Sequence, residues 1–228
     1  MEHGRYHLYV SFACPWSSYA LQVLKLKGLD KSISFSATLP EWGSIQSGAK
    51  TKGWVFEEAK QGEHHSTQIL EKQLLYKDPV NGYSSIKQLY QRSIPGYQGL
   101  FMLPVLWDKR THQIVNNESN EIVDMLNTKF NSLATNKIDY RPKGKKDLET
   151  FLNEDINMGV YKVGFVRTQS EYEAACKQLF KSLGKLEQIL SKQKFVCGSQ
   201  PTLLDIRLFE TLIRFDLVYS TIFKCNHK

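Results

Sequence analysis

Cysteine is scarce in this sequence, and the pattern of the few cysteines excludes two kinds of site. The 228 residues contain four of them, none in a C-x-x-C pair or at a Cys/His spacing typical of zinc: Cys14, Cys176, Cys197 and Cys225. Such isolated cysteines indicate a reducing compartment without structural disulfides. The adjacent His64 and His65 lack cysteine or carboxylate partners at ligand spacing, so we predict no metal site.

Three further features are missing. No apolar run approaches membrane length, and no secretory signal opens the sequence, so we expect no membrane association. Thirty basic against 23 acidic residues give a net charge of +7, but no basic stripe interleaved with aromatics is present. We therefore predict no nucleic-acid binding and a surface suited to an anionic small molecule. The expected location is cytoplasmic, or the chloroplast if a transit peptide has been removed.

The most informative stretch that is present joins a strand to a helix through Cys14 and Pro15. Apolar and polar residues alternate over about 6–13, which predicts a half-buried strand, and helical spacing follows over 17–28. Pro15 suits a first helical turn, so Cys14 should precede a helix N-terminus, where free N–H groups and the helix dipole favour a thiolate. The alternative is that Cys14 is a small buried hydrophobic residue.

The first half of the chain has the element order of a thioredoxin-like sheet. A strand over 32–38 follows the first helix, and the long segment 40–99 loses its periodicity except for a helix over 84–92. A hairpin and a helix then follow, with strands over 101–107 and 113–115 and the helix opening at 116–119. Pro104 inside a strand pattern needs a special reason. In a thioredoxin-like fold that reason is a cis Leu103–Pro104 peptide, which presents the backbone of Val105 beside the cysteine.

The second half is predicted to be helical. Helical patterns cover 147–157 and 171–191, the latter with one apolar stripe that belongs to the core. A last helix begins at Thr202 with Asp205 in capping-box position, and its residues Ile206, Phe209, Leu212 and Ile213 are expected to face inward. We therefore predict a thioredoxin-like α/β domain over 1–132, a linker over 133–144 and an all-α domain over 145–228.

A thioredoxin-like domain followed by a helical domain with this capping box resembles the glutathione transferase fold. Ordered blocks are similar to the glutathionyl-hydroquinone reductases, the Xi-class transferases, and are nearest to the plant-type members. The main blocks are Arg5-Tyr6-His7-Leu8-Tyr9-Val10-Ser11, Ala13-Cys14-Pro15-Trp16, Gly53-Trp54-Val55-Phe56, Asp78-Pro79-Val80-Asn81-Gly82, Pro104-Val105-Leu106-Trp107-Asp108-Lys109, Ile114-Val115-Asn116-Asn117-Glu118-Ser119, Gly159-Val160-Tyr161-Lys162, Arg214-Phe215-Asp216 and Phe223-Lys224-Cys225-Asn226.

The resemblance implies a reaction and a role for individual residues. Cys14 matches a nucleophile that takes glutathione from a glutathionyl-hydroquinone, forming a mixed disulfide that a second glutathione resolves. Four further positions match glutathione-binding residues: Trp54, Val105, Glu118 and Ser119. Tyr161 matches a tyrosine of the site for the aromatic acceptor. The implied co-substrate is glutathione without a metal, the implied partners are aromatic glutathione conjugates, and a homodimer is expected.

Two positions depart from the family pattern. The family usually carries arginine at the position of Tyr19, and arginine or lysine at that of Leu100, so we expect weaker binding of glutathione. Lys52, Arg92 and Lys162 are possible replacements for the lost charge, but the sequence does not place them. Family members also continue beyond the position of the last residue, which implies a C-terminally truncated or divergent member with a more open acceptor site.

Two functions of different classes follow. The first is a glutathione-dependent reductase of glutathionyl-hydroquinones that acts through Cys14. The second is a degenerate, truncated relative that binds a ligand or a partner with little turnover. Ordinary glutathione conjugation is disfavoured, because a cysteine at this position forms a mixed disulfide where conjugation needs a hydroxyl.

Overall fold

The structure is a computed structural model that describes residues 1–45, 52–57 and 75–226. It divides into two compact units, Met1–Ile138 and Asp139–Lys228. The division falls inside the stretch 133–144, the polar segment that the sequence marks as a linker.

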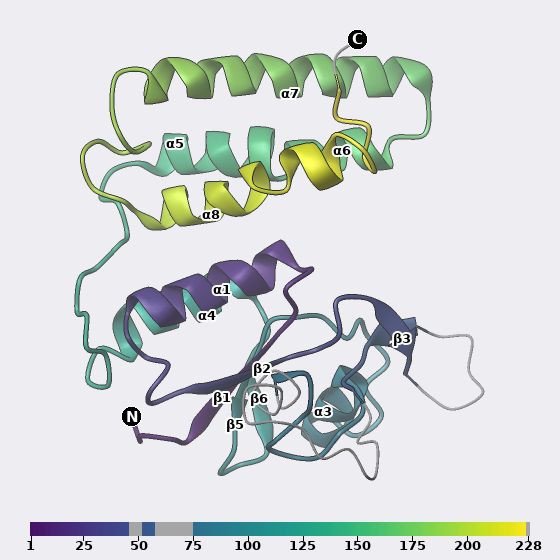
Figure 1. Cartoon of the computed structure of the whole chain (residues 1–228), viewed down its shortest axis with the longest axis vertical. Helices are drawn as coiled ribbons and strands as arrows, with labels where there is room; N and C mark the ends of the chain where they lie inside the picture. The colour runs from purple at the N-terminus through teal and green to yellow at the C-terminus, as the bar shows by residue number, and fades with distance from the viewer. Residues whose placement is uncertain (46–51, 58–74, 227–228) are drawn as a thin grey trace, which may run out of the picture. The chain divides into compact units, whose positions relative to one another are not determined.

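The first unit is built on a four-stranded mixed sheet with the order β2-β1-β5-β6 (Figure 1). Its strands are β1 (Tyr6–Val10), β2 (Ser34–Ala37), β5 (Val105–Asp108) and β6 (Gln113–Asn116). Strands β1 and β2 are parallel, whereas the β1–β5 and β5–β6 pairs are antiparallel. This order confirms the predicted thioredoxin-like sheet.

Helices cover both faces of this sheet. Helices α1 (Pro15–Leu26) and α4 (Ser119–Asp124) pack against each other on one face, and α4 continues into a π-helical turn, Met125–Lys129. Helix α3 (Ile86–Ser93) lies on the other face, where its Ile86 and Leu89 pack with Tyr9 of β1. Ser85 and Gln88 form a capping box at its start.

The prediction of a half-buried first strand is wrong. All five residues of β1 are buried, including His7 and Tyr9. Because β1 is a central strand with helices on both faces of its sheet, neither of its faces reaches solvent. The buried imidazole of His7 finds its hydrogen-bond partners on the neighbouring strand β2: Nδ1 lies 2.8 Å from the hydroxyl of Ser34, which is exposed, and Nε2 lies 2.9 Å from that of Ser36, which is buried.

The long aperiodic segment contains a small sheet that the sequence did not predict. Strands β3 (Trp42–Ser44) and β4 (Lys52–Trp54) pair antiparallel, with Trp42 opposite Trp54. Three-residue strands are too short to show a period of two, which is why the pattern misses them. His64 and His65 lie outside the described residues.

The second unit consists of helices around two apolar clusters. Its elements are α5 (Lys146–Phe151) with the π-helical continuation Leu152–Asn157, α6 (Gly159–Phe165), α7 (Gln169–Leu190), α8 (Leu203–Leu212) and a π-helical turn at Phe215–Tyr219. The predicted stripe of α7 contributes Cys176, Leu179 and Leu186 to these clusters, as expected. No helix among the described residues is long and apolar enough to cross a membrane.

The predicted inward face of α8 is wrong in part. Ile206 is buried, but Phe209, Leu212 and Ile213 are 48%, 38% and 55% exposed. The helix instead packs through Leu204 and Leu208 against Leu152 and Ile156, and position 209 is turned about 100° from position 208. The capping box at its start is confirmed, since the Asp205 carboxylate accepts hydrogen bonds from the Thr202 N–H at 2.8 Å and the Thr202 hydroxyl at 2.7 Å.

Candidate functional site

Cys14 lies between β1 and α1 and is the N-cap residue of that helix, as the sequence predicts. Its backbone is extended, with φ −94° and ψ 115°, and Pro15 occupies the first helical turn. Hydrogen bonds on both sides fix the turn: the Cys14 N–H donates to the Ser11 carbonyl at 3.1 Å, and the Ser18 N–H donates to the Cys14 carbonyl at 3.0 Å. These hydrogen bonds hold the backbone of Cys14, which carries the sulfur, in place at the N-terminus of α1.

The thiol of Cys14 is 8% exposed and lies against the loop that precedes β5. Its Sγ–H donates to the Leu103 carbonyl oxygen at 3.7 Å, and the Leu103–Pro104 peptide is cis, as predicted. A thiolate has no proton to donate and is repelled by a carbonyl oxygen. The N–H groups of the first helical turn, which have no partner within the helix, follow directly after Cys14.

Val105 lies at the same end of the sheet as Cys14. It is the first residue of β5 and pairs with Tyr9 of β1, whereas the pairing of β5 with β6 begins one residue later, between Leu106 and Asn116. Val105 is fully buried and follows the cis Pro104 directly. The structure thus brings the Cys14 thiol and the start of β5 together, through Leu103.

Glu118 and Ser119 follow β6 at this same end of the sheet. Glu118 is the N-cap residue of α4 and is exposed, whereas Ser119, the first helical residue, is 7% exposed. The Glu118 N–H donates to the Asn116 side-chain oxygen at 2.7 Å, which fixes the entry to the helix. Cys14, Val105 and the Glu118–Ser119 pair therefore lie at the same end of three neighbouring strands, Val105 as the first residue of β5 and the others just beyond β1 and β6.

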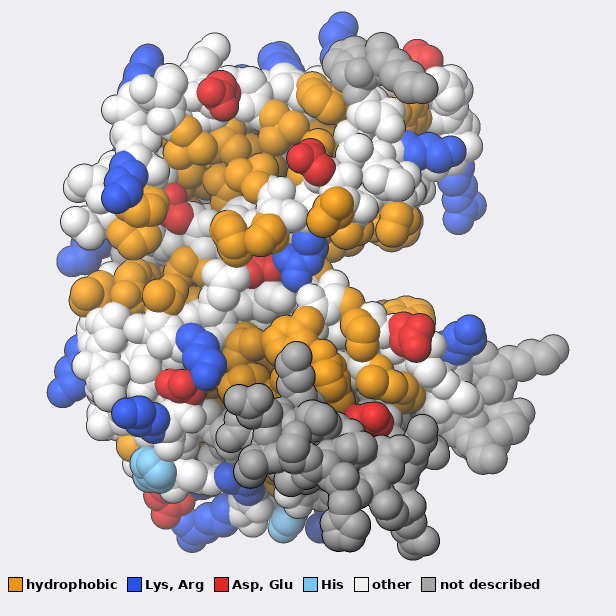
Figure 2. All heavy atoms as spheres, viewed as in Figure 1, with side chains coloured by type: hydrophobic (Ala, Val, Ile, Leu, Met, Phe, Trp, Pro, Cys, Tyr) orange, Lys and Arg blue, Asp and Glu red, His pale blue; other side chains and the backbone are white. Residues whose placement is uncertain are grey.

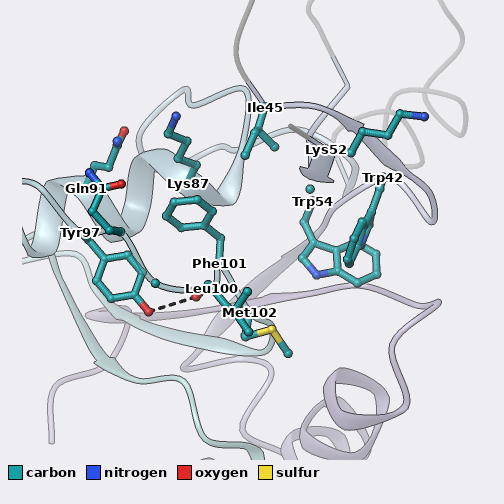
Figure 3. A pocket seen from close by; sticks show the side chains of 13 residues that line it. Trp42, Ile45, Lys52, Trp54, Lys87, Gln91, Tyr97, Leu100, Phe101 and Met102 are labelled. Atoms are coloured by element: carbon teal, nitrogen blue, oxygen red, sulfur yellow. Dashed lines mark hydrogen bonds between the residues drawn. The ribbon is translucent and has the colours of Figure 1, made fainter. Parts of the chain in front are cut away.

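Trp54 lines a cavity of about 560 Å³ between the β3–β4 hairpin, α3 and the segment 97–102 (Figure 3). The Trp54 ring packs edge-on against Trp42, with centroids 5.9 Å apart. The other walls are mostly apolar or aromatic and include Tyr97, Phe101 and Met102. Lys52 and Lys87 are the only charged side chains among the described residues that line it.

The two departures from the family pattern have different surroundings. Tyr19 is buried in α1, at 5% exposure, whereas Leu100 is 75% exposed and lines the cavity with Trp54. Of the possible replacements for the lost charge, Lys52 lines this cavity. Lys162 lies in the second unit, where its Nζ donates to the Glu154 carbonyl at 2.9 Å. Elsewhere, the lysines and arginines are scattered over the face shown in Figure 2.

Tyr161 belongs to an aromatic cluster of the second unit. Its ring centroid lies 5.7 Å from that of Tyr219 and 5.3 Å from that of Phe223, and the hydroxyls of Tyr161 and Tyr219 are 3.3 Å apart. Burial raises the pKa of Tyr219 above its ordinary range, so this phenol stays protonated. The role of Tyr161 toward a substrate stays a prediction.

Two of the three remaining cysteines are buried. Cys225 is 1% exposed, its Sγ–H donates to the Val160 carbonyl at 3.5 Å, and burial raises its pKa to about 12. Cys176 is also buried, and Cys197 is intermediate in exposure. Within the described parts of the chain, no group of three or more His, Cys, Asp or Glu side chains is arranged to hold a metal ion.

Sequence reasoning missed several of these positions. Trp42, Lys87, Tyr97 and Phe101 lie in the aperiodic segment or on a short helix, where nothing in the sequence joins them to Trp54. For Trp54, Glu118 and Ser119, the only signal in the sequence was the resemblance of the surrounding stretches to the Xi-class transferases. For Cys14 the sequence also carries a local signal, the strand–Cys–Pro–helix pattern, which by itself leaves open the alternative of a small buried hydrophobic residue.

Comparison with known proteins yields consistent matches. The family model described as "Glutathione S-transferase, N-terminal domain" matches residues 13–129, and the model described as "Glutathione S-transferase, C-terminal domain" matches residues 169–225. The chain is 41% identical to the glutathionyl-hydroquinone reductase YqjG of Escherichia coli over 229 residues, covering 99% of the chain and 64% of that protein. It is 38% identical to the glutathionyl-hydroquinone reductase PcpF of Sphingobium chlorophenolicum, covering 99% and 67%.

Solved structures give the same result. The glutathione-bound structure of YqjG superposes with a TM-score of 0.85 at 40% identity, covering all of this chain and 69% of that one. Glutathione transferase Xi 1 from Trametes versicolor superposes with a TM-score of 0.82 at 43% identity, covering all of this chain and 74% of that one. The chain thus spans about two thirds of the length of the curated relatives it matches.

Proposed function

Because this chain belongs to the Xi class of the glutathione transferase family, we propose that it is a glutathione-dependent reductase of S-glutathionyl-hydroquinones that acts through a Cys14–glutathione mixed disulfide. The observation that carries the proposal is the position of Cys14. Its thiol lies at the N-terminus of a 12-residue helix and against the loop that leads through cis Pro104 to Val105. The curated relatives with the reductase name support the choice of substrate.

The proposed reaction has two thiol-exchange steps. The Cys14 thiolate attacks the sulfur of the conjugate, the bond between that sulfur and the aromatic carbon breaks, and the aromatic ring leaves with the electron pair and takes up a proton. The products are the hydroquinone and a Cys14–glutathione disulfide. A second glutathione thiolate then attacks the glutathione sulfur, which releases glutathione disulfide and restores the Cys14 thiolate.

Each step needs the glutathionyl group held beside Cys14. We assign the backbone of Val105 to the cysteinyl part of glutathione, because its outer edge is not paired with β6 in the described sheet. The Ser119 hydroxyl and the first N–H groups of α4 would bind the γ-glutamyl carboxylate, and the Glu118 carboxylate would accept from its amine. Trp54 would cover the peptide from the side of the β3–β4 hairpin.

In this scheme Tyr161 acts on the aromatic acceptor. Its phenol would hydrogen-bond the hydroquinone oxygen as the ring leaves. The Tyr161 hydroxyl lies 3.3 Å from the Tyr219 hydroxyl, and this contact orients the Tyr161 ring within the aromatic cluster of the second unit. We expect Tyr161→Phe to lower kcat more than it raises the KM for glutathione.

The test is the substitution Cys14→Ala, assayed with a glutathionyl-hydroquinone and glutathione. We expect a loss of turnover on the order of 10³-fold or more, because the nucleophile is removed. Cys197→Ala is the matched control, since Cys197 is a partly exposed free cysteine of the second unit. Full activity of Cys14→Ala would overturn the proposal.

Two side chains favour the alternative function, a binding protein with little turnover. Leu100 is exposed on the wall of the Trp54 cavity and Tyr19 is buried, where the family usually places cations. These departures favour a protein that binds glutathione or its conjugates with little turnover. Calorimetric binding of glutathione without measurable turnover in the unaltered protein would support this alternative over the reductase.

A further inference from the structure

A buried carboxylate in the loop that precedes α3 is surrounded by hydrogen-bond donors. Asp78 is 7% exposed, and its Oδ1 accepts from the Tyr9 hydroxyl at 2.7 Å. The N–H groups of Val80 and Asn81 donate to the same oxygen at 3.0 and 3.2 Å, and the Tyr83 N–H donates to Oδ2 at 3.2 Å. The carboxylate thus closes this loop on itself and ties it to the central strand β1.

The Tyr9 hydroxyl has a defined direction in this contact. Asn81 Nδ2 donates to it at 3.0 Å, so its own proton is directed to Asp78. Burial and the adjacent carboxylate raise the pKa of Tyr9 well above its ordinary range, so the phenol keeps that proton. Every group that meets the carboxylate is therefore an N–H or O–H donor, and an amide at position 78 would turn its own N–H₂ group toward one of them.

The residues that follow this loop pair with the segment after Trp54. The Phe56 N–H donates to the Ser84 carbonyl at 2.9 Å, and Val55 forms an antiparallel bridge with Ser85. Val55 directly follows Trp54 in the chain, and the Trp54 side chain packs against the apolar cluster that contains Phe56. A shift of the loop would therefore move the backbone that carries Trp54.

The residues before the carboxylate contact the turn that leads to Cys14. The Tyr76 ring packs edge-on against the ring of Phe12, with centroids 6.3 Å apart, and Phe12 lies between β1 and Cys14. The Tyr76 carbonyl also accepts from the Glu57 N–H at 2.7 Å. The stretch around the loop therefore touches both the turn that bears the thiol and the segment that bears the tryptophan.

We propose that Asp78 is a positioning residue for the thiol-transfer reaction, which fixes Trp54 relative to Cys14 by closing the loop between their segments. The inference rests on the proposed function, in which Trp54 covers the peptide while the ligand sulfur reacts at Cys14. Asp78 acts through the loop and does not touch the ligand in this scheme. Its loss should therefore weaken the binding of glutathione without changing the reactivity of the thiol toward a small reagent.

The test is Asp78→Asn, which keeps the size of the side chain and removes one acceptor oxygen. We expect the KM for glutathione to rise about 5- to 10-fold with kcat within about twofold, the size expected when one hydrogen bond of the support is lost. Alkylation of Cys14 by iodoacetamide should keep its rate, and hydrogen exchange at the Phe56 N–H should become faster. Tyr9→Phe, which removes a single hydroxyl, should show the same pattern with a KM raised about 2- to 3-fold.

Asp205→Asn is the matched control, because the Asp205 carboxylate also accepts backbone N–H groups, those of Val196 and Thr202, but in the second unit. It should leave the KM for glutathione and the exchange at Phe56 unchanged. An unchanged KM in Asp78→Asn, an equal rise in the control, or a changed rate of Cys14 alkylation would overturn the inference. If Asp78→Asn does not fold, the same criteria apply to Tyr9→Phe.

Absence of turnover in the unaltered protein would defeat the proposed function instead. In that case calorimetric titration with glutathione decides the inference. Weaker binding by Asp78→Asn than by the unaltered protein, together with faster exchange at the Phe56 N–H, supports it. Equal or absent binding in both proteins refutes it.

Discussion

Lowering the pH from 7 to 5 should destabilise the first unit through one side chain, His7. This imidazole is fully buried in the central strand, between the hydroxyls of Ser34 and Ser36. Burial, and secondarily the positive charge of Lys109, lower its pKa from 6.5 to about 3. The folded state therefore keeps His7 neutral at a pH where the unfolded chain protonates it.

The sign and size of the effect follow from proton linkage. Because the folded pKa lies below the unfolded one, the stability associated with neutral His7 is complete above pH 6.5 and is lost as the pH falls toward 3. With those two pKa values, the free energy of unfolding should fall by about 2 kcal/mol between pH 7 and pH 5. The Asp108 carboxyl contributes in a lower window, since the hydrogen bonds from Arg5 lower its pKa from 3.8 to about 2.

The assay is urea unfolding followed by tryptophan fluorescence. All four tryptophans lie in the first unit, so the signal reports that unit alone: Trp16, Trp42, Trp54 and Trp107. His7→Gln retains a donor and an acceptor but cannot titrate, and it should flatten the dependence between pH 7 and pH 5. His3→Gln, at an exposed histidine, should leave the dependence unchanged. Parallel pH dependences of His7→Gln and the unaltered protein would refute the reasoning.

Two further predictions concern stability. Ser17→Ala should leave the first unit unchanged or stabilise it by up to about 1 kcal/mol in the same assay, because the Ser17 hydroxyl is buried without a partner among the described residues. Ser36→Ala, which removes a partner of His7, should instead cost about 1–2 kcal/mol, and the opposite order would contradict the hydrogen-bond assignment. Asp205→Ala should destabilise the second unit by about 2–3 kcal/mol in urea unfolding followed by circular dichroism, since it deprives the N–H groups of Thr202 and Val196 of their acceptor at 2.8 Å. Asp216→Ala, at an exposed carboxylate, is the control, and equal losses in the two variants would show that the cap contributes nothing.

Sequence patterns predicted those parts of the fold that depend on local interactions. The strand–Cys–Pro–helix junction, the hairpin after cis Pro104 and the capping box at Thr202 each depend on residues close together in the chain. The burial of β1 could not be predicted in this way. Whether a strand is half or fully buried depends on what packs on its second face, and α3, which covers it, comes from a segment almost eighty residues later.

The same distinction between local interactions and the packing of distant segments applies to the candidate site. The position of Cys14 follows from its neighbours, whereas the cavity with Lys52 and Lys87 forms only when β4, α3 and the segment 97–102 come together. The face of α8 was mispredicted because Phe209 and Ile213 are as apolar as Leu204 and Leu208. When two sides of a helix are both apolar, hydrophobicity alone does not decide which of them packs against the neighbouring helix.

Mass spectrometry of the protein after reaction with a glutathionyl-hydroquinone, in the absence of free glutathione, tests the central claim most directly. The proposed mechanism predicts one glutathione per chain, attached through a disulfide to the peptide that contains Cys14 and released by added glutathione. Cys176, Cys197 and Cys225 should remain unmodified, and Cys14→Ala should acquire no adduct. Release of the hydroquinone without an adduct at Cys14, or with the glutathione on another cysteine, would contradict the account.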